Sequence, residues 1–117
     1  MSDGINIEQR SIVLMPFPYS DLSGSKKRPA LVVSSTEFNK SNEDIICCLI
    51  TSNLEDKQHS ITISNKDVES GFLEFESKIK AYRMFTINRR LIYRFLCRLN
   101  SQKFKLVLKE IEKIIGL

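Results

Sequence analysis

The sequence predicts a mainly β protein that ends in one α-helix. Between residues 11 and 99, short runs of β-branched and aliphatic side chains alternate with turn-forming residues, which is the pattern of short strands. Residues 101–117 instead carry apolar side chains at helical spacing. A chain of 117 residues can bury a core without a metal or disulfide. We therefore expect a single domain over residues 11–117, preceded by a loose lead-in of residues 1–10.

The first two predicted strands enclose a short cationic loop. The apolar runs are residues 12–15 and 30–33, and the SGS sequence at residues 23–25 is typical of a loop. The loop continues through Lys26 and Lys27 to Arg28. Because Pro29 favours extended backbone in the residue before it, we expect Arg28 where the loop joins the second strand. A guanidinium beside a Gly, Ser and Lys loop can clamp a phosphate.

Three further strands and a short helix are expected downstream. Residues 44–50 form an apolar run, residues 60–64 alternate as SITIS, and residues 78–87 mix apolar with basic side chains. A short helix fits residues 37–42. Residues 91–99 match both the helical period and the strand period, so periodicity alone leaves a strand and a basic helix open.

The C-terminal helix is the clearest helical segment. Ser101 can cap its first turn, and Gly116 supplies the stop. Its expected apolar face consists of Phe104, Val107, Leu108, Ile111, Ile114 and Ile115. We expect this face to pack across the sheet.

Charge is unevenly distributed along the chain. Residues 1–77 carry 7 Lys and Arg against 12 Asp and Glu, whereas residues 78–117 carry 11 against 2. Such a basic segment suits an anionic partner, either a nucleic acid or an acidic protein segment. The alternative is an ordinary solvated face whose Lys and Arg stems cover apolar surface.

Composition excludes several classes of protein. The sequence has no apolar run of the ~18 residues that a membrane span needs, and its first residues lack the apolar centre of a signal peptide, so we expect a soluble cytoplasmic protein. Cys47, Cys48 and Cys97 show no CxxC spacing. On a strand, the adjacent Cys47 and Cys48 would face opposite ways. We therefore expect all three cysteines to be reduced packing residues.

Metal-dependent and paired-histidine chemistry are both disfavoured. His59 is the one histidine of the sequence, and its place before a predicted strand suggests an exposed structural role rather than catalysis. Neither Glu55 with Asp56 nor Glu74 with Glu76 has convincing metal-ligand spacing. We expect no cofactor.

Two motifs resemble the signatures of the MazF/PemK family of toxins from type II toxin-antitoxin pairs. The first is PFPYSDLSGSKKRPALVVS at residues 16–34, and the second is ITSN at residues 50–53. The resemblance implies an SH3-like small barrel of the MazF/PemK/CcdB type, covers the chain from about Ser11 onward, and favours a strand over residues 91–99. The chain departs from the family where Arg10 and Ser11 replace a Gly-Asp pair, and where Phe85 and Asn88 replace the ends of an Arg-Thr-Ile-Asp segment. These departures leave the two signatures intact.

The resemblance implies a sequence-specific endoribonuclease (an mRNA interferase) whose catalytic residues are Arg28 and Thr51. Such an enzyme needs no metal, because the ribose 2′-hydroxyl can attack the adjacent phosphorus and leave 2′,3′-cyclic phosphate and 5′-hydroxyl ends. Arg28 can hold the phosphate, and Thr51 can donate its hydroxyl to a phosphoryl oxygen. Arginine stays protonated, so the residues themselves support only an electrostatic role for Arg28. A strand-end residue chosen for β propensity is the structural alternative for Thr51.

Binding of single-stranded RNA is expected near the cationic loop. Aromatic rings can stack on unpaired bases, cations can engage phosphates, and small polar side chains can bond phosphates or base edges. The candidates are Phe17, Tyr19, Ser25, Lys26, Lys27, Ser52, Asn53 and Arg83. For Phe17 and Tyr19, a place in the core is an equal alternative.

The family also implies partners. We expect a homodimer that is neutralised by a cognate antitoxin with an acidic segment able to lie across the basic surface. Two other functions remain open: a CcdB-like inhibitor of DNA gyrase, which would leave Arg28 and Thr51 without a role, and a noncatalytic nucleic-acid-binding barrel.

Overall fold

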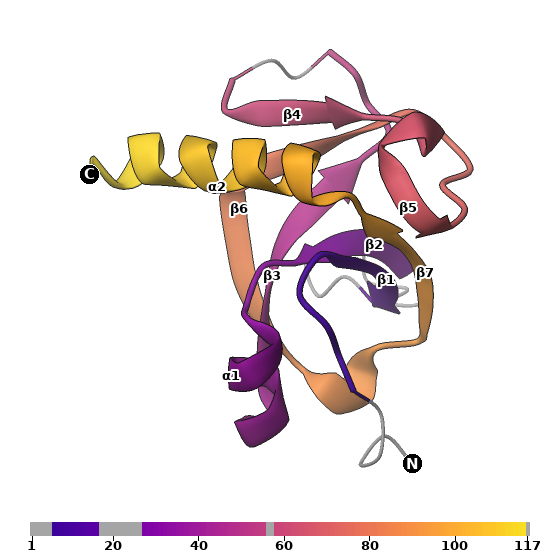
Figure 1. The fold of residues 1–117 in the computed structure, drawn as a ribbon, viewed down its shortest axis with the longest axis vertical. Coiled ribbons are helices and arrows are strands. Elements are labelled where there is room, and N and C mark those ends of the chain that lie inside the picture. The colour runs from indigo at the N-terminus through magenta and orange to yellow at the C-terminus, as the bar shows by residue number, and fades with distance from the viewer. Residues whose placement is uncertain (1–5, 17–26, 56–57, 117) are drawn as a thin grey trace.

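The described residues form one curled antiparallel sheet crossed by a C-terminal helix (Figure 1). The computed structural model describes residues 6–16, 27–55 and 58–116. Within them, seven strands follow the order β4-β6-β3-β2-β1-β7-β5. The strands are β1 (Ser11–Pro16), β2 (Lys27–Val32), β3 (Asp44–Thr51), β4 (Ser60–Ile63), β5 (Val68–Gly71), β6 (Ser77–Asn88) and β7 (Arg94–Leu99). The helices are α1 (Thr36–Ser41) and α2 (Ser101–Ile115), with short 3₁₀ turns η2 (Asn65–Asp67) and η3 (Arg89–Leu91).

The predicted fold class is confirmed, and so are most of its elements. Each strand expected from the apolar runs is present, and residues 91–99 contain strand β7 rather than a basic helix. Strand β5 was missed, because its sequence VESG has no apolar alternation. It pairs with β7 through Gly71, whose φ of 81° favours glycine. A Cβ on Gly71 would lie 2.6 Å from the Cα of Cys97, so the close approach of the two strands also requires glycine.

The sheet separates two apolar clusters, as the two-residue period of a strand dictates. On β3, Cys48 and Ile50 belong to the cluster beneath α2, while Ile45 and Cys47 belong to the cluster on the opposite face. The prediction that Cys47 and Cys48 face opposite sides is therefore correct. All three cysteines are free and buried.

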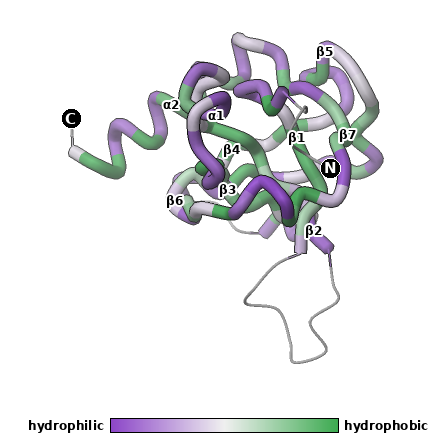
Figure 2. Tube along the Cα trace, turned by 90° about the horizontal axis from the view of Figure 1, so that it is seen from below, coloured by the Kyte–Doolittle hydropathy of each residue, from purple (hydrophilic) through white to green (hydrophobic). Residues whose placement is uncertain are grey.

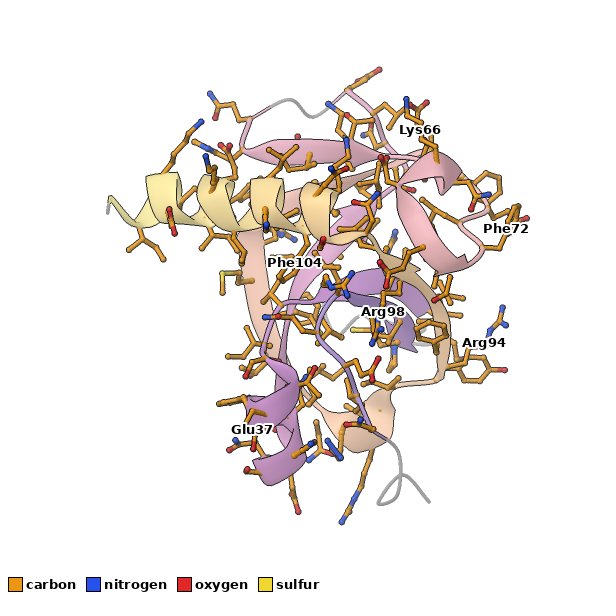
Figure 3. All side chains as sticks on the ribbon, in the orientation of Figure 1. Glu37, Lys66, Phe72, Arg94, Arg98 and Phe104 are labelled. Carbon is orange, nitrogen blue, oxygen red and sulfur yellow. The ribbon has the colours of Figure 1, made fainter. Side chains whose placement is uncertain are left out.

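Helix α2 covers the first cluster with its N-terminal half. Phe104 and Val107 are buried there, and Figure 3 shows Phe104 between the helix and the sheet. The predicted cap was wrong by one residue: Asn100 is the N-cap, and its Oδ1 accepts a hydrogen bond of 2.8 Å from the backbone N of Lys103. The predicted stop is correct, because Gly116 takes a left-handed conformation with φ 89°.

The C-terminal half of α2 extends beyond the sheet (Figure 2). Leu108, Ile114 and Ile115 belong to the predicted apolar face, but 37%, 39% and 62% of their surfaces are exposed. The expectation that the whole face packs across the sheet holds for the first turns only. No described helix has the length and apolarity to cross a membrane.

The second cluster is closed by the segment before β1 and by α1. Ile7, which lies in the expected lead-in, is buried. Its carbonyl oxygen accepts a hydrogen bond of 2.9 Å from Nδ2 of Asn39 on α1, and Gln9 Nε2 donates to the carbonyl oxygen of Val33 at 2.9 Å. Residues 7–10 are thus tied to the body. Arg10 takes φ 79° at a position where the resembling family commonly has glycine.

Candidate active site

A cavity of about 270 Å³ opens where β1, β2, β3 and β7 meet the segment that joins β5 to β6. Its apolar wall consists of Leu14, Pro29, Ile50, Leu73, Phe75 and Leu96. Its charged and hydroxyl-bearing wall includes Lys27, Arg28, Thr51, Ser52, Glu74 and Arg94. The cavity therefore combines a cationic lining with one carboxylate and side-chain hydroxyls.

The pairing of β2 with β3 brings the two predicted catalytic residues together. These strands are antiparallel, with Ala30 opposite Leu49, and two more residues along each strand lead to Arg28 and Thr51. Both side chains are half-buried and both line the cavity. Pro29 interrupts no hydrogen bond to β3, because the pairing of β2 with β3 begins only at Ala30.

Thr51 is held at the start of a tight turn. Its Oγ1 accepts a hydrogen bond of 3.1 Å from the backbone N of Asn53, and Asn53 Oδ1 accepts one of 3.0 Å from the backbone N of Glu55. Because a hydroxyl can accept one bond and donate another, the Thr51 proton can still be directed into the cavity. Ser52 also lines the cavity, whereas Asn53 uses its side chain to shape the turn.

Lys27 and Arg94 extend the cationic lining. Lys27 Nζ lies 4.5 Å from the centroid of the Tyr93 ring, a cation–π geometry that holds the ammonium at the cavity edge. Arg94 is exposed on β7 beside β1, opposite Leu14. In Figure 3 it points outward on the same side of the molecule as Phe72, whose backbone N donates to the carbonyl oxygen of Leu96.

Sequence reasoning missed Arg94 and Glu74 as cavity residues. Arg94 lies within residues 91–99, whose sequence fits both the helical period and the strand period. Only a strand places Arg94 and Leu96, which are two residues apart, on the same face. Glu74 was considered only as a metal ligand. In the described part of the chain, no group of three His, Cys, Asp or Glu residues is placed to hold a metal ion.

The other predicted binding residues lie elsewhere or outside the described residues. Arg83 is exposed on β6 and does not line the cavity. Phe17, Tyr19, Ser25 and Lys26 fall outside the described residues.

His59 is exposed, as expected, and contacts the C-terminal helix. Its Nδ1 lies 2.7 Å from Oε2 of Glu110 on α2, which ties the turn before β4 to the C-terminal helix. It does not line the cavity.

The cysteines also lie outside the cavity, and burial raises the pKa of the Cys47 and Cys48 thiols to about 12 and that of Cys97 to about 11. Thiolate chemistry is therefore disfavoured at all three.

Comparison with known families and structures gives a consistent result. A family model described as "PemK-like, MazF-like toxin of type II toxin-antitoxin system" matches residues 8–115. No curated relative matches the chain.

Several solved structures share the fold. An endoribonuclease from a mycobacterial species, in complex with its cognate antitoxin, is 14% identical with a TM-score of 0.76 over 95% of this chain and 96% of that one. MazF from Deinococcus radiodurans (Form-I) is 18% identical with a TM-score of 0.76, over 95% and 97% of the two chains. The Mycobacterium tuberculosis toxin MazF-mt6 is 16% identical with a TM-score of 0.74, over 92% and 98%. At these identities the likeness establishes a common fold.

Proposed function

Because the chain belongs to the PemK-like, MazF-like toxins of type II toxin-antitoxin systems, we propose that it is a metal-independent endoribonuclease that cleaves single-stranded RNA at specific sequences. The observation that carries the proposal is the cavity to which Arg28 and Thr51 both contribute. Arg28 lies in the first family signature and Thr51 in the second, and they match the catalytic Arg and Thr of the family. A structural neighbour from a mycobacterial species is likewise an endoribonuclease.

The chemistry of the cavity suits attack by the ribose 2′-hydroxyl. That reaction needs the 2′-oxygen, the phosphorus and the 5′-oxygen in line, and it places extra negative charge on the phosphoryl oxygens. Arg28 holds the phosphate through charge-assisted hydrogen bonds. Thr51 donates its hydroxyl to a phosphoryl oxygen. The products are a 2′,3′-cyclic phosphate and a 5′-hydroxyl end.

The cavity edge offers contacts for RNA on either side of the cleaved bond. Lys27 and Arg94 can pair with neighbouring phosphates, and Ser52 can bond a phosphate or a base edge. Single-stranded RNA is the expected substrate, because in-line attack requires a backbone that can leave the A-form geometry.

The same cationic surface suits an acidic antitoxin segment, and structural neighbours include MazF of Deinococcus radiodurans in complex with MazE. We also propose that the protein forms a homodimer.

The test is incubation of the purified protein with a long single-stranded RNA in EDTA, followed by mapping of the product ends. We expect discrete cuts that carry 2′,3′-cyclic phosphate and 5′-hydroxyl ends. Arg28→Ala should lower the cleavage rate by ~10²-fold or more, as loss of a charge-stabilising donor does. Arg90→Ala is the matched control, because Arg90 is exposed in η3 and does not line the cavity.

Two results would reject the proposal. Equal cleavage by wild type and Arg28→Ala would mean that the cavity is not the catalytic centre. Intact RNA together with capture of DNA gyrase would favour a gyrase inhibitor, whereas salt-sensitive RNA binding without new 5′-hydroxyl ends would favour a noncatalytic binding module.

A further inference from the structure

Attack by a 2′-hydroxyl requires a group that takes its proton. Arg28 cannot do so, because a guanidinium has no free lone pair for a proton and stays charged in proteins. Lys27 and Arg94 are cations as well, and the hydroxyls of Thr51 and Ser52 are poor bases. None of these five cavity residues is therefore a good acceptor for the proton.

Glu74 is a candidate acceptor in the cavity wall. Among the described residues that line the cavity, Glu74 alone carries a carboxylate, and none is a histidine. His59 cannot substitute, because it lies outside the cavity and contacts Glu110. A carboxylate that lies within hydrogen-bond reach of a bound hydroxyl can act as a general base.

The backbone on each side of Glu74 makes a hydrogen bond with a side chain. The Leu73 side chain is buried in the cluster beneath α2, and its backbone N donates a hydrogen bond of 2.9 Å to Oδ1 of Asn65. On the other side, Ser77 is buried and its Oγ donates to the carbonyl oxygen of Phe75 at 2.8 Å. These contacts anchor the neighbours of Glu74, whose own side chain is exposed and lines the cavity.

Among the described residues that line the cavity, the charged side chains other than Glu74 are all positive. Lys27 and Arg28 come from β2, and Arg94 comes from β7. Glu74 and the nearest carboxylate in sequence, Glu76, are both exposed, but only Glu74 lines the cavity. A phosphate bound by these cations would therefore lie in the same cavity as the Glu74 carboxylate.

We propose that Glu74 is the general base of the reaction, an inference that rests on the proposed endoribonuclease function. The Glu74 carboxylate accepts the 2′-hydroxyl proton as the 2′-oxygen forms its bond to phosphorus. The bond between phosphorus and the 5′-oxygen then breaks, and the leaving 5′-oxygen takes a proton from water. The Glu74 carboxyl returns its proton to solvent, so no net water is consumed.

The test compares Glu74→Gln, Glu74→Asp and the matched control Glu76→Gln in single-turnover cleavage of a short single-stranded RNA. We expect Glu74→Gln to cleave ~100-fold more slowly, Glu74→Asp to retain part of the rate, and Glu76→Gln to match the wild type. Binding of an uncleavable analogue with a 2′-deoxyribose at the cut site should not weaken in Glu74→Gln, because only a negative charge is removed.

The outcomes separate this inference from the proposed function. If the wild type cuts RNA and Glu74→Gln cuts it equally fast, the Glu74 assignment is wrong and the endoribonuclease function stands. If Glu74→Gln is slow only because it no longer binds the uncleavable analogue, Glu74 is a binding residue and the assignment again fails. If the wild type cuts no RNA, both proposals fail.

Discussion

The cysteines illustrate how burial sets the chemistry of individual side chains. Their raised pKa values follow chiefly from burial, with a further contribution at Cys47 from neighbouring Cys48. An ordinary thiol has a pKa of 9.0, whereas that of folded Cys48 is about 12. Between these values the unfolded chain loses the proton and the folded chain keeps it. The contribution to stability is therefore fully present below pH 9 and is lost as the pH rises toward 12.

This linkage predicts that the free energy of unfolding falls as the pH rises above 9. Urea unfolding at pH 8, 9 and 10 measures the effect. At pH 8, Cys48→Ala should have a lower free energy of unfolding than the wild type, since a cavity replaces its side chain. Its free energy of unfolding should then fall less steeply as the pH rises. In the folded protein, all three thiols should also resist a thiol reagent at pH 8 and react once the chain is unfolded. Rapid labelling of the folded protein, or the same slope with pH in both proteins, would contradict this account.

The candidate site could be predicted from the sequence only in part. Arg28 and Thr51 were found because each lies in a local motif. Glu74 and Arg94 were missed because their place on the cavity wall depends on contacts between distant segments, such as the pairing of Arg94 with Leu14 across β7 and β1. A local pattern carries no information about such pairings.

Helix α2 shows the same limit at the level of an element. Its existence and its C-terminal stop follow from apolar spacing and Gly116. The cap depends on backbone geometry, and Asn100 and Ser101 are both capping residue types. The sequence alone could not decide between them.

The cap assignment predicts that Asn100→Ala lowers the free energy of unfolding by ~1 kcal/mol, because the backbone N of Lys103 loses its acceptor. Ser101→Ala should change stability by less than ~0.5 kcal/mol, since Ser101 is an exposed first helical residue. Urea denaturation of the two variants measures the difference. A larger loss for Ser101→Ala than for Asn100→Ala would restore Ser101 as the cap.

Across the whole molecule, folding neutralises part of the charge asymmetry of the sequence. Arg98 forms ion pairs with Glu8 and Glu69, and Lys103 Nζ lies 3.6 Å from Oδ1 of Asp67. Basic residues of the C-terminal third thus meet acidic residues of the N-terminal part. Arg94, by contrast, is exposed and lines the edge of the cavity. The sequence indicated a basic segment, but only the strand order determines which of its cations remain available to a partner.

Because Arg94 lines the cavity and Arg98 pairs with carboxylates, we predict that these two arginines of β7 affect RNA affinity differently. Arg94→Ala should weaken binding of an uncleavable single-stranded RNA and reduce the slope of log affinity against log salt by ~0.7. Arg98→Ala should leave that slope unchanged, because its side chain pairs within the protein. Titrations at several salt concentrations measure both. Equal reductions in slope would show that Arg98 also reaches the RNA.

Arg28 and Thr51 are proposed to act together in one cavity, and a double-mutant cycle measures the coupling between them. Single-turnover cleavage rates would be measured for wild type, Arg28→Ala, Thr51→Val and the double variant, with Thr62→Val as the control, because Thr62 is exposed on β4 and does not line the cavity. We expect each single change to slow cleavage by ~10²-fold or more, and the double variant to be scarcely slower than the slower single one, because the residues act as a unit. Wild-type rates in Arg28→Ala and Thr51→Val, or effects that multiply independently, would contradict the account.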